Sequence, residues 1–107
     1  LTTYLINSKF DCLLSRISIR DKWFIDESER VILFHGINTV QKAEPWIPQY
    51  GHWNMKNLTH LSYLRKWGFN CVRLGFMWSG LYPNENELNQ TYVDEMFNIV
   101  NTLEEYG

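Results

Sequence analysis

The amino-acid sequence predicts an α/β fold in which two buried strands alternate with two helices and lie parallel in one sheet. Residues 31–34 are an apolar run and residues 71–76 are mostly apolar, and both segments have the length of buried strands. A helical spacing of apolar residues follows each run. Strands that alternate with helices form parallel sheets, because each helix returns the chain to the end of the sheet where the next strand starts.

A β-hairpin is expected ahead of the first buried strand. The partly apolar stretch 17–24 precedes a polar turn at residues 26–29, which leads into the strand at 31–34. This strand is apolar at every position, as is typical of strands that are covered on both faces. It ends in residues 35–38, where Gly36 permits a tight exit or a close approach of another backbone.

A long loop is expected at residues 39–53, between the first strand and the first helix. Pro45, Pro48 and Gly51 disfavour regular structure there. Loops of this length in compact domains often carry function. The other conspicuous side chains of the loop are Lys42, Glu44, Trp46, Tyr50, His52 and Trp53.

Both helices are predicted from their apolar spacing and their ends. In the first helix, Asn54 is expected to be the N-cap and Gly68 the left-handed C-cap. Its apolar stripe is Leu58, Leu61, Leu64 and Trp67. A second loop, 77–90, leads to the second helix, which is expected to start with a capping box at 91–94 and to end at Gly107. Its stripe is Val93, Met96, Phe97, Val100 and Leu103.

Composition bounds the possible partners. The 107 residues include ten basic and twelve acidic side chains, spread along the chain, so nucleic acid is not a predicted partner. The sequence has no apolar run of about 18 residues, so no membrane-spanning helix is predicted. It has no phosphate loop, nucleotide motif or metal-ligand cluster, and neither a cofactor nor a metal is predicted. Cys12 and Cys71 could pair, but the apolar setting of Cys71 favours a buried free thiol.

Several segments, in order and with matching spacing, resemble one enzyme family. Residues 23–27 and 30–38 resemble the opening of glycoside hydrolase family 5 enzymes, and residues 67–78 resemble their second-strand segment. The resemblance covers about residues 18–107. Because the family folds as a (β/α)8 barrel, it implies that this chain contains the N-terminal part of a TIM barrel.

The implied barrel is incomplete, with the hairpin and the first two βα units, since a whole barrel takes about 250 residues. Residues 1–16 would be an unassigned N-terminal extension. Residues 17–107 would be the N-terminal part of a glycoside hydrolase catalytic domain.

Within the family, the endoglycoceramidase branch is the most similar, on Lys42, Pro45 and Pro48 in the first loop and on residues 89–92. The resemblance implies a retaining glycosidase with two catalytic Glu residues. One, after the fourth strand, is the acid/base, and the other, after the seventh, is the nucleophile. Endoglycoceramidases cleave the bond between the glycan and the ceramide of glycosphingolipids.

No catalytic residue is therefore expected within this chain, because both Glu residues would lie downstream. The 107 residues alone are expected to be inactive and poorly stable. Glu85 and Glu87 do not match the catalytic positions of the family and are interpreted as part of a solvated loop.

Arg73 is the strongest candidate for a supporting role. Along the second strand, Cys71 and Arg73 alternate with Val72 and Leu74, and the apolar pair should face the helices. Arg73 would then point into the barrel, where a buried guanidinium needs a carboxylate partner. The resemblance implies that this partner is the nucleophile, whose pKa the cation would lower. The alternative is an ion pair with another interior acid.

Other candidates follow the two strands. Asn38 and His35 are expected to end the first strand at the active-site face. Asn38 could bind a sugar hydroxyl or stabilise a turn, and His35 could bind a ligand or be structural.

In the loops, Lys42 matches a family lysine that would contact the sugar next to the ceramide, or it is simply solvated. Trp78 could offer a flat face to a pyranose or a ceramide chain, whereas Trp46 and Trp53 are expected to pack the loop.

Two Asn-x-Thr triplets, residues 57–59 and 89–91, are signals for N-glycosylation. Asn57 and Asn89 are therefore candidate glycosylation sites if the protein enters a secretory pathway. They favour a secreted or lysosomal location. The predicted partner is a glycan or glycolipid substrate, which could lie at a membrane surface. Two alternatives stay open: a family 5 glycosidase of the cellulase or mannanase type that acts on soluble β-glycans, and a noncatalytic carbohydrate- or lipid-binding remnant.

Overall fold

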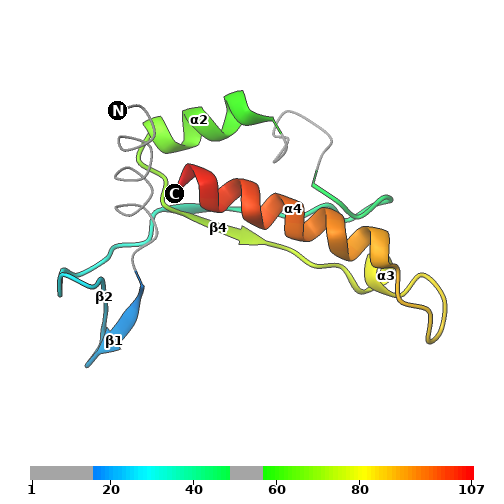
Figure 1. The fold of residues 1–107 in the computed structure, drawn as a ribbon, viewed down its shortest axis with the longest axis horizontal. Coiled ribbons are helices and arrows are strands. Elements are labelled where there is room, and N and C mark those ends of the chain that lie inside the picture. Colours follow the sequence, from blue (N-terminus) through cyan, green and yellow to red (C-terminus); the bar gives the residue numbers. More distant parts are fainter. Residues whose placement is uncertain (1–15, 49–56) are drawn as a thin grey trace, which may run out of the picture.

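The computed structural model describes residues 16–48 and 57–107, and Figure 1 shows the elements of that part of the chain. In order they are β1 (Ser18–Arg20), β2 (Trp23–Ile25), β3 (Gly36–Thr39), α2 (Leu58–Lys66), β4 (Cys71–Leu74), α3 (Trp78–Leu81) and α4 (Gln90–Tyr106). This order confirms the predicted hairpin, strand, helix, strand and helix, and adds the short helix α3 within the predicted loop 77–90. The predictions for 1–15, including Cys12, and for Tyr50, Gly51, His52 and Trp53 lie outside the described residues.

The hairpin turns earlier in the chain than predicted. β1 and β2 pair antiparallel, which leaves Asp21 and Lys22 as a two-residue turn. Asp21 has a φ of 53°, in the left-handed region that Asp tolerates better than most residues. The predicted polar turn at 26–29 is also present, since Ile25 and Val31 form an antiparallel bridge across it.

Asp26 stabilises this second turn. Its Oδ1 accepts hydrogen bonds from the backbone N–H groups of Ser28 and Arg30, each at 2.9 Å, and its Oδ2 accepts one from Arg30 Nε at 2.7 Å. The backbone N–H of Arg30 is the largest cause that lowers the pKa of Asp26 below its ordinary value of 3.8, although desolvation opposes it. The folded chain therefore favours the charged carboxylate.

The first buried strand lies later in the chain than predicted. Residues 31–34 contribute only an isolated bridge, and the strand is β3, at Gly36–Thr39. The cause is Asn70, whose Oδ1 accepts a hydrogen bond from the N–H of His35 at 2.9 Å and whose Nδ2 donates one to the carbonyl of Leu33 at 3.0 Å. This side chain takes the place of backbone pairing. The predicted burial on both faces is also wrong, since Leu33 is 75% exposed.

β3 and β4 form a parallel pair with Gly36 opposite Cys71 and Thr39 opposite Leu74. Gly36 allows the close approach that the sequence suggested, because a Cβ at this position would lie 2.2 Å from the carbonyl oxygen of Cys71. Cys71 itself is half-buried and its thiol is free. The N–H of Gly75 extends the ladder by donating to the carbonyl of Thr39 at 3.0 Å. β4 itself ends at Leu74, whereas the predicted strand continued to residue 76.

Helix α2 connects the two parallel strands. Its N-cap is Asn57 and not the predicted Asn54, and the Oδ1 of Asn57 accepts a hydrogen bond from the N–H of Thr59 at 3.0 Å. Gly68 follows the helix with a φ of 84°, which confirms the predicted left-handed position.

Helix α4 begins before the predicted capping box at 91–94. Its N-cap is Asn89, which accepts a hydrogen bond from the N–H of Tyr92 at 3.1 Å, and it ends at Gly107 as predicted. The predicted stripe is partly wrong, because Phe97 is 57% exposed. The fully buried side chains of this helix are Tyr92, Met96 and Ile99.

The core lies on one face of the β3–β4 sheet. Its buried side chains are Ile47, Leu61, Leu64, Tyr92, Met96 and Ile99. From the sheet, Ile37, Val72 and Leu74 pack against this cluster. The opposite face carries Asn38 and Arg73, and the described residues place no second layer over it.

Candidate functional site

The parallel pair has one end at which loops of an active site can gather. β3 and β4 run in the same direction, and α2 and α4 each begin beyond the loop that follows their strand (Figure 1). In parallel α/β proteins, binding and catalytic residues lie at this carboxyl end of the strands. Of the predicted site residues, Asn38, Arg73, Lys42 and Trp78 lie on or after the carboxyl halves of the strands.

Asn38 and Arg73 are direct partners in the register of β3 and β4. Paired residues on neighbouring strands project from the same face, and the strands lie about 4.8 Å apart. Because Val72 and Leu74 pack against the helices, Asn38 and Arg73 project from the other face. Arg73 thus projects away from the helices, as the alternation along the strand predicted, and Asn38 is its neighbour in the register. That this face is the interior of a barrel stays a prediction.

The predicted burial of Arg73 is not found. Its side chain is exposed, and within residues 16–48 and 57–107 it forms no hydrogen bond or ion pair. The physical reason is that the described residues cover the apolar face of the sheet only. Arg73 therefore presents five N–H donors from a fixed strand, which suits the recognition of a carboxylate.

His35 does not end the first strand, so the position predicted for it is wrong. It precedes β3 and lies at the opposite end of the sheet from the loops. Its ring stacks on Phe69, with centroids 4.3 Å apart and planes at 20°, and its carbonyl accepts a hydrogen bond from the N–H of Asn70 at 2.9 Å. These contacts give His35 a structural role, and a ligand-binding role stays a prediction.

Lys42 and Trp46 belong to the loop after β3. Lys42 is exposed. Trp46 is half-buried and packs against the core cluster, which agrees with the predicted packing role, and it has a φ of 66°. The loop is therefore anchored by its indole and by buried Ile47, while Lys42 faces solvent.

Trp78 begins helix α3, shortly after β4. Its side chain is 73% exposed, and its ring lies 5.0 Å from that of Tyr82 with the planes tilted by 34°. Sequence analysis missed Tyr82, although an aromatic pair four residues apart was visible. Together the exposed ring of Trp78 and the half-buried ring of Tyr82 form an aromatic pair after the carboxyl end of β4.

Tyr92 holds α3 in place from the side of the core. Its hydroxyl accepts a hydrogen bond from the N–H of Met77 at 2.8 Å, directly before α3. A Cβ on Gly80 would lie 2.6 Å from the Tyr92 ring, so the glycine lets α3 and α4 pack closely. Tyr92 was not in the predicted stripe, but its spacing to Met96 fits one helical face.

Glu85 and Glu87 are both exposed in the loop between α3 and α4. The carboxylate of Glu87 accepts a hydrogen bond from Asn84 Nδ2 at 2.9 Å. These positions agree with the interpretation of the pair as part of a solvated loop.

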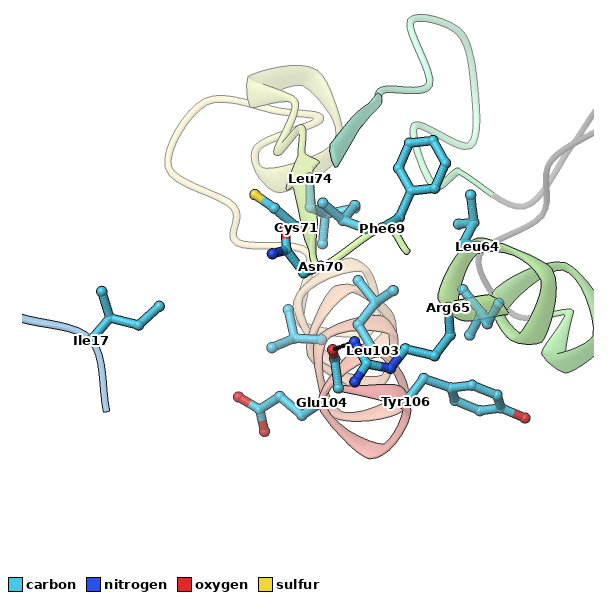
Figure 2. Close-up of a pocket in the computed structure, with 14 residues that line it drawn as sticks. Ile17, Leu64, Arg65, Phe69, Asn70, Cys71, Leu74, Leu103, Glu104 and Tyr106 are labelled. Carbon is cyan, nitrogen blue, oxygen red and sulfur yellow. Dashed lines mark hydrogen bonds between the residues drawn. The ribbon is translucent and has the colours of Figure 1, made fainter. Parts of the chain in front are cut away.

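A cavity of about 600 Å³ lies between α2, β4 and α4, with mostly apolar walls (Figure 2). Its lining includes Asn70 and Cys71, at the start of β4, and Leu103 and Tyr106, near the end of α4. Arg65 Nη1 donates a hydrogen bond to the carbonyl of Gly107 at 3.2 Å beside it (Figure 2). The cavity lies on the helix side of the sheet, whereas Asn38 and Arg73 project from the other face.

Within residues 16–48 and 57–107, His, Cys, Asp and Glu side chains do not form a group of three or more that could hold a metal ion. In the same part of the chain, each helix is too short or too polar to cross a membrane.

Comparison with known proteins identifies the family. Residues 25–107 match the family described as cellulase, glycosyl hydrolase family 5. The chain belongs to glycosyl hydrolase family 5. Family 5 domains are (β/α)8 barrels, and a hairpin followed by a parallel βαβ unit and a further helix is consistent with part of such a barrel.

Relatives named endoglycoceramidase match most of this chain. An endoglycoceramidase from Hydra vulgaris is 34% identical over 104 residues, which is 95% of this chain and 20% of the relative. Endoglycoceramidase I from Rhodococcus hoagii is 32% identical, over 78% of this chain and 16% of the relative. An endoglycoceramidase from Cyanea nozakii is 29% identical, over 89% of this chain and 19% of the relative. The chain thus spans a fifth or less of the length of these relatives.

Proposed function

We propose that the protein containing this chain is a retaining glycosidase that hydrolyses the O-glycosidic bond between oligosaccharide and ceramide in glycosphingolipids. The observation that carries this proposal is the similarity of most of the chain to relatives named endoglycoceramidase. Membership of glycosyl hydrolase family 5 supports the broader statement that the protein is a glycoside hydrolase.

Retaining hydrolysis requires two carboxyl groups about 5–5.5 Å apart, one on each side of the scissile bond. One donates a proton to the leaving ceramide oxygen, and the other attacks the anomeric carbon. We expect both Glu residues on later strands of the barrel, so the residues described here would support the reaction rather than carry it out.

In this proposal Arg73 lies beside the nucleophilic carboxylate. A guanidinium at that place stabilises the ionised carboxylate and lowers its pKa, which keeps the nucleophile ready to attack. Asn38, the neighbour of Arg73 across the parallel pair, would hydrogen-bond a sugar hydroxyl or orient the nucleophile. The fixed register of the two strands supports these roles, because it holds both side chains on one face.

Lys42 and Trp78 would contact the substrate further out. Lys42 is exposed in the loop after β3 and would donate a hydrogen bond to the sugar next to the ceramide. The exposed ring of Trp78 and the half-buried ring of Tyr82 beside it offer an apolar surface that suits the face of a pyranose or the start of a ceramide chain.

A second candidate is a family 5 glycosidase that acts on soluble β-glycans, which the description of the family as cellulase favours. A third is a noncatalytic carbohydrate- or lipid-binding protein.

The test uses the natural protein that contains this chain, with a fluorescent glycosphingolipid and with soluble cellulose and mannan derivatives. Release of an intact oligosaccharide and ceramide supports the proposal, whereas cleavage of only the polymers supports the second candidate. Binding without cleavage supports the third.

A secreted or lysosomal location also belongs to this proposal. The two glycosylation triplets support it, since such triplets are modified only in a secretory pathway. Fractionation of the cells that make the protein, with detection in the medium and in lysosomes, is the direct test. Recovery in the cytosol alone would contradict this location.

A further inference from the structure

Two Asn-x-Thr triplets occupy the same structural position in this fold. Asn57 is the N-cap of α2, and Asn89 is the N-cap of α4. The Thr of each triplet, Thr59 or Thr91, is the second residue of its helix. Both Asn residues have extended backbones, with φ and ψ of −86° and 106° at Asn57 and −82° and 91° at Asn89.

The amide of each Asn uses its oxygen to cap the helix. The Oδ1 of Asn57 accepts hydrogen bonds from the N–H groups of Thr59 at 3.0 Å and His60 at 3.4 Å. The Oδ1 of Asn89 accepts one from the N–H of Tyr92 at 3.1 Å. Within residues 16–48 and 57–107, the Nδ2 of neither Asn donates a hydrogen bond. The capping geometry therefore leaves the nitrogen of each amide unengaged in this part of the chain.

Both triplets are accessible in the folded chain. Asn57 and Thr59 are exposed, and Leu58 between them is 53% exposed. Asn89 is half-buried, and the two residues that follow it are exposed. Neither Asn belongs to the buried core cluster, so a bulky substituent would be attached outside the core.

The two helices begin at the same end of the sheet. In Figure 1, the start of α2 and the start of α4 both lie toward the end of the molecule to which β4 points. Substituents on Asn57 and Asn89 would therefore lie at the loop-bearing end of the molecule, outside the strands that carry Asn38 and Arg73.

We infer that Asn57 and Asn89 are acceptors of N-linked glycans. The co-substrate is an oligosaccharide attached to a lipid pyrophosphate. Its C1–O bond to the pyrophosphate breaks, a C1–Nδ2 bond forms, and the proton from Nδ2 leaves with the lipid pyrophosphate. The new bond leaves Oδ1 free to accept hydrogen bonds, so each residue caps its helix and carries a glycan at the same time. The inference rests on the secretory location proposed above, and it does not depend on the substrate of the enzyme.

The test uses the natural protein that contains this chain, directed into the secretory pathway of a eukaryotic cell. Both secreted and cell-associated protein are analysed, because these glycans are added during synthesis. Treatment with peptide N-glycosidase in ¹⁸O-water converts each glycosylated Asn to labelled Asp. We expect the label at both Asn57 and Asn89. Absence of the label from either residue would overturn its assignment.

Matched variants separate the glycan from the helix cap. Thr59→Ala and Asn57→Asp each remove the first triplet but keep an oxygen acceptor at the N-cap. Thr91→Ala and Asn89→Asp do the same for the second. Each should remove one glycan from the mass of the protein while the yield of folded protein stays close to parental. If neither variant of a triplet loses the mass of a glycan, the inference for that site is wrong.

Discussion

Asn38 and Arg73 lie side by side across the parallel strands β3 and β4, on the face that the helices leave uncovered. Their proximity does not depend on long flexible loops, because the backbone ladder fixes it. Gly36 and Cys71, two pairs earlier in the register, bring the two strands so close that no Cβ fits at position 36. The arrangement therefore gives a cation and an amide at a position set by the sheet.

Replacing Arg73 with Ala should lower kcat/KM of the natural protein on a glycosphingolipid by about 100-fold or more, as expected when one preorganised electrostatic group is lost. Without the guanidinium, the nucleophilic carboxyl would hold its proton more tightly, so its pKa would rise. The acid limb of the pH profile of kcat/KM should therefore move to higher pH.

The controls for this prediction are Arg73→Lys and Lys66→Ala. Arg73→Lys keeps the charge and should retain more activity and an acid limb near the parental one. Lys66 is an exposed cation in the last turn of α2, and its removal should leave the profile unchanged. An Arg73→Ala protein with parental kcat/KM would contradict the role proposed for Arg73.

Replacing Trp78 with Ala should weaken substrate binding. The indole is exposed next to Tyr82, and an aromatic contact contributes about 0.5–1.5 kcal/mol, so KM should rise by about 2-fold to 13-fold with little change in kcat. Trp78→Phe keeps a flat apolar face and should stay close to the parental KM. Steady-state kinetics on a labelled glycosphingolipid measures both constants, and a loss confined to kcat would argue against a binding role.

The sequence predicted the features that local patterns decide. The period-two alternation of β4 gave the direction of Arg73, and the left-handed position of Gly68 followed from residue type. The place of β3 could not be predicted in this way, because it depends on hydrogen bonds from Asn70 to residues 33 and 35, far away in the chain. The exposure of Arg73 could not be predicted from the sequence either, because it depends on what covers that face of the sheet.

Removing the Asn70 side chain should destabilise the fold through this long-range link. Asn70→Ala loses one hydrogen bond with the N–H of His35 and one with the carbonyl of Leu33, for a cost of about 1–3 kcal/mol. Asn98→Ala, on the exposed surface of α4, is the matched control and should be neutral or slightly stabilising. Urea unfolding of the natural protein measures both, and equal midpoints for the two variants would contradict the prediction.

Gly36→Ala should be more harmful than its small size suggests. The new Cβ would lie 2.2 Å from the carbonyl oxygen of Cys71, so the strands must separate, at a cost of about 2 kcal/mol or more. Gly68→Ala is the contrast: apart from its chain neighbours, no atom of residues 16–48 and 57–107 lies within 4 Å of its Cβ position. Only the left-handed backbone, with a φ of 84°, opposes the change. That should cost about 1 kcal/mol. In thermal unfolding, the midpoint temperature of Gly36→Ala should be lower than that of Gly68→Ala.

Asp26 should make the stability of the hairpin region depend on pH. Its pKa is lowered in the folded chain, chiefly by the backbone N–H of Arg30, so folding favours the ionised carboxyl. This contribution is complete above the ordinary pKa of 3.8 and is lost as the pH falls through the lower pKa of the folded state. Asp26→Asn removes the charge, so the variant should lose less stability than the parent between pH 6 and pH 2. Urea midpoints at both pH values measure this difference, with the exposed-loop variant Glu85→Gln as the control. Equal losses in the parent and in Asp26→Asn would mean that Asp26 contributes no acid sensitivity.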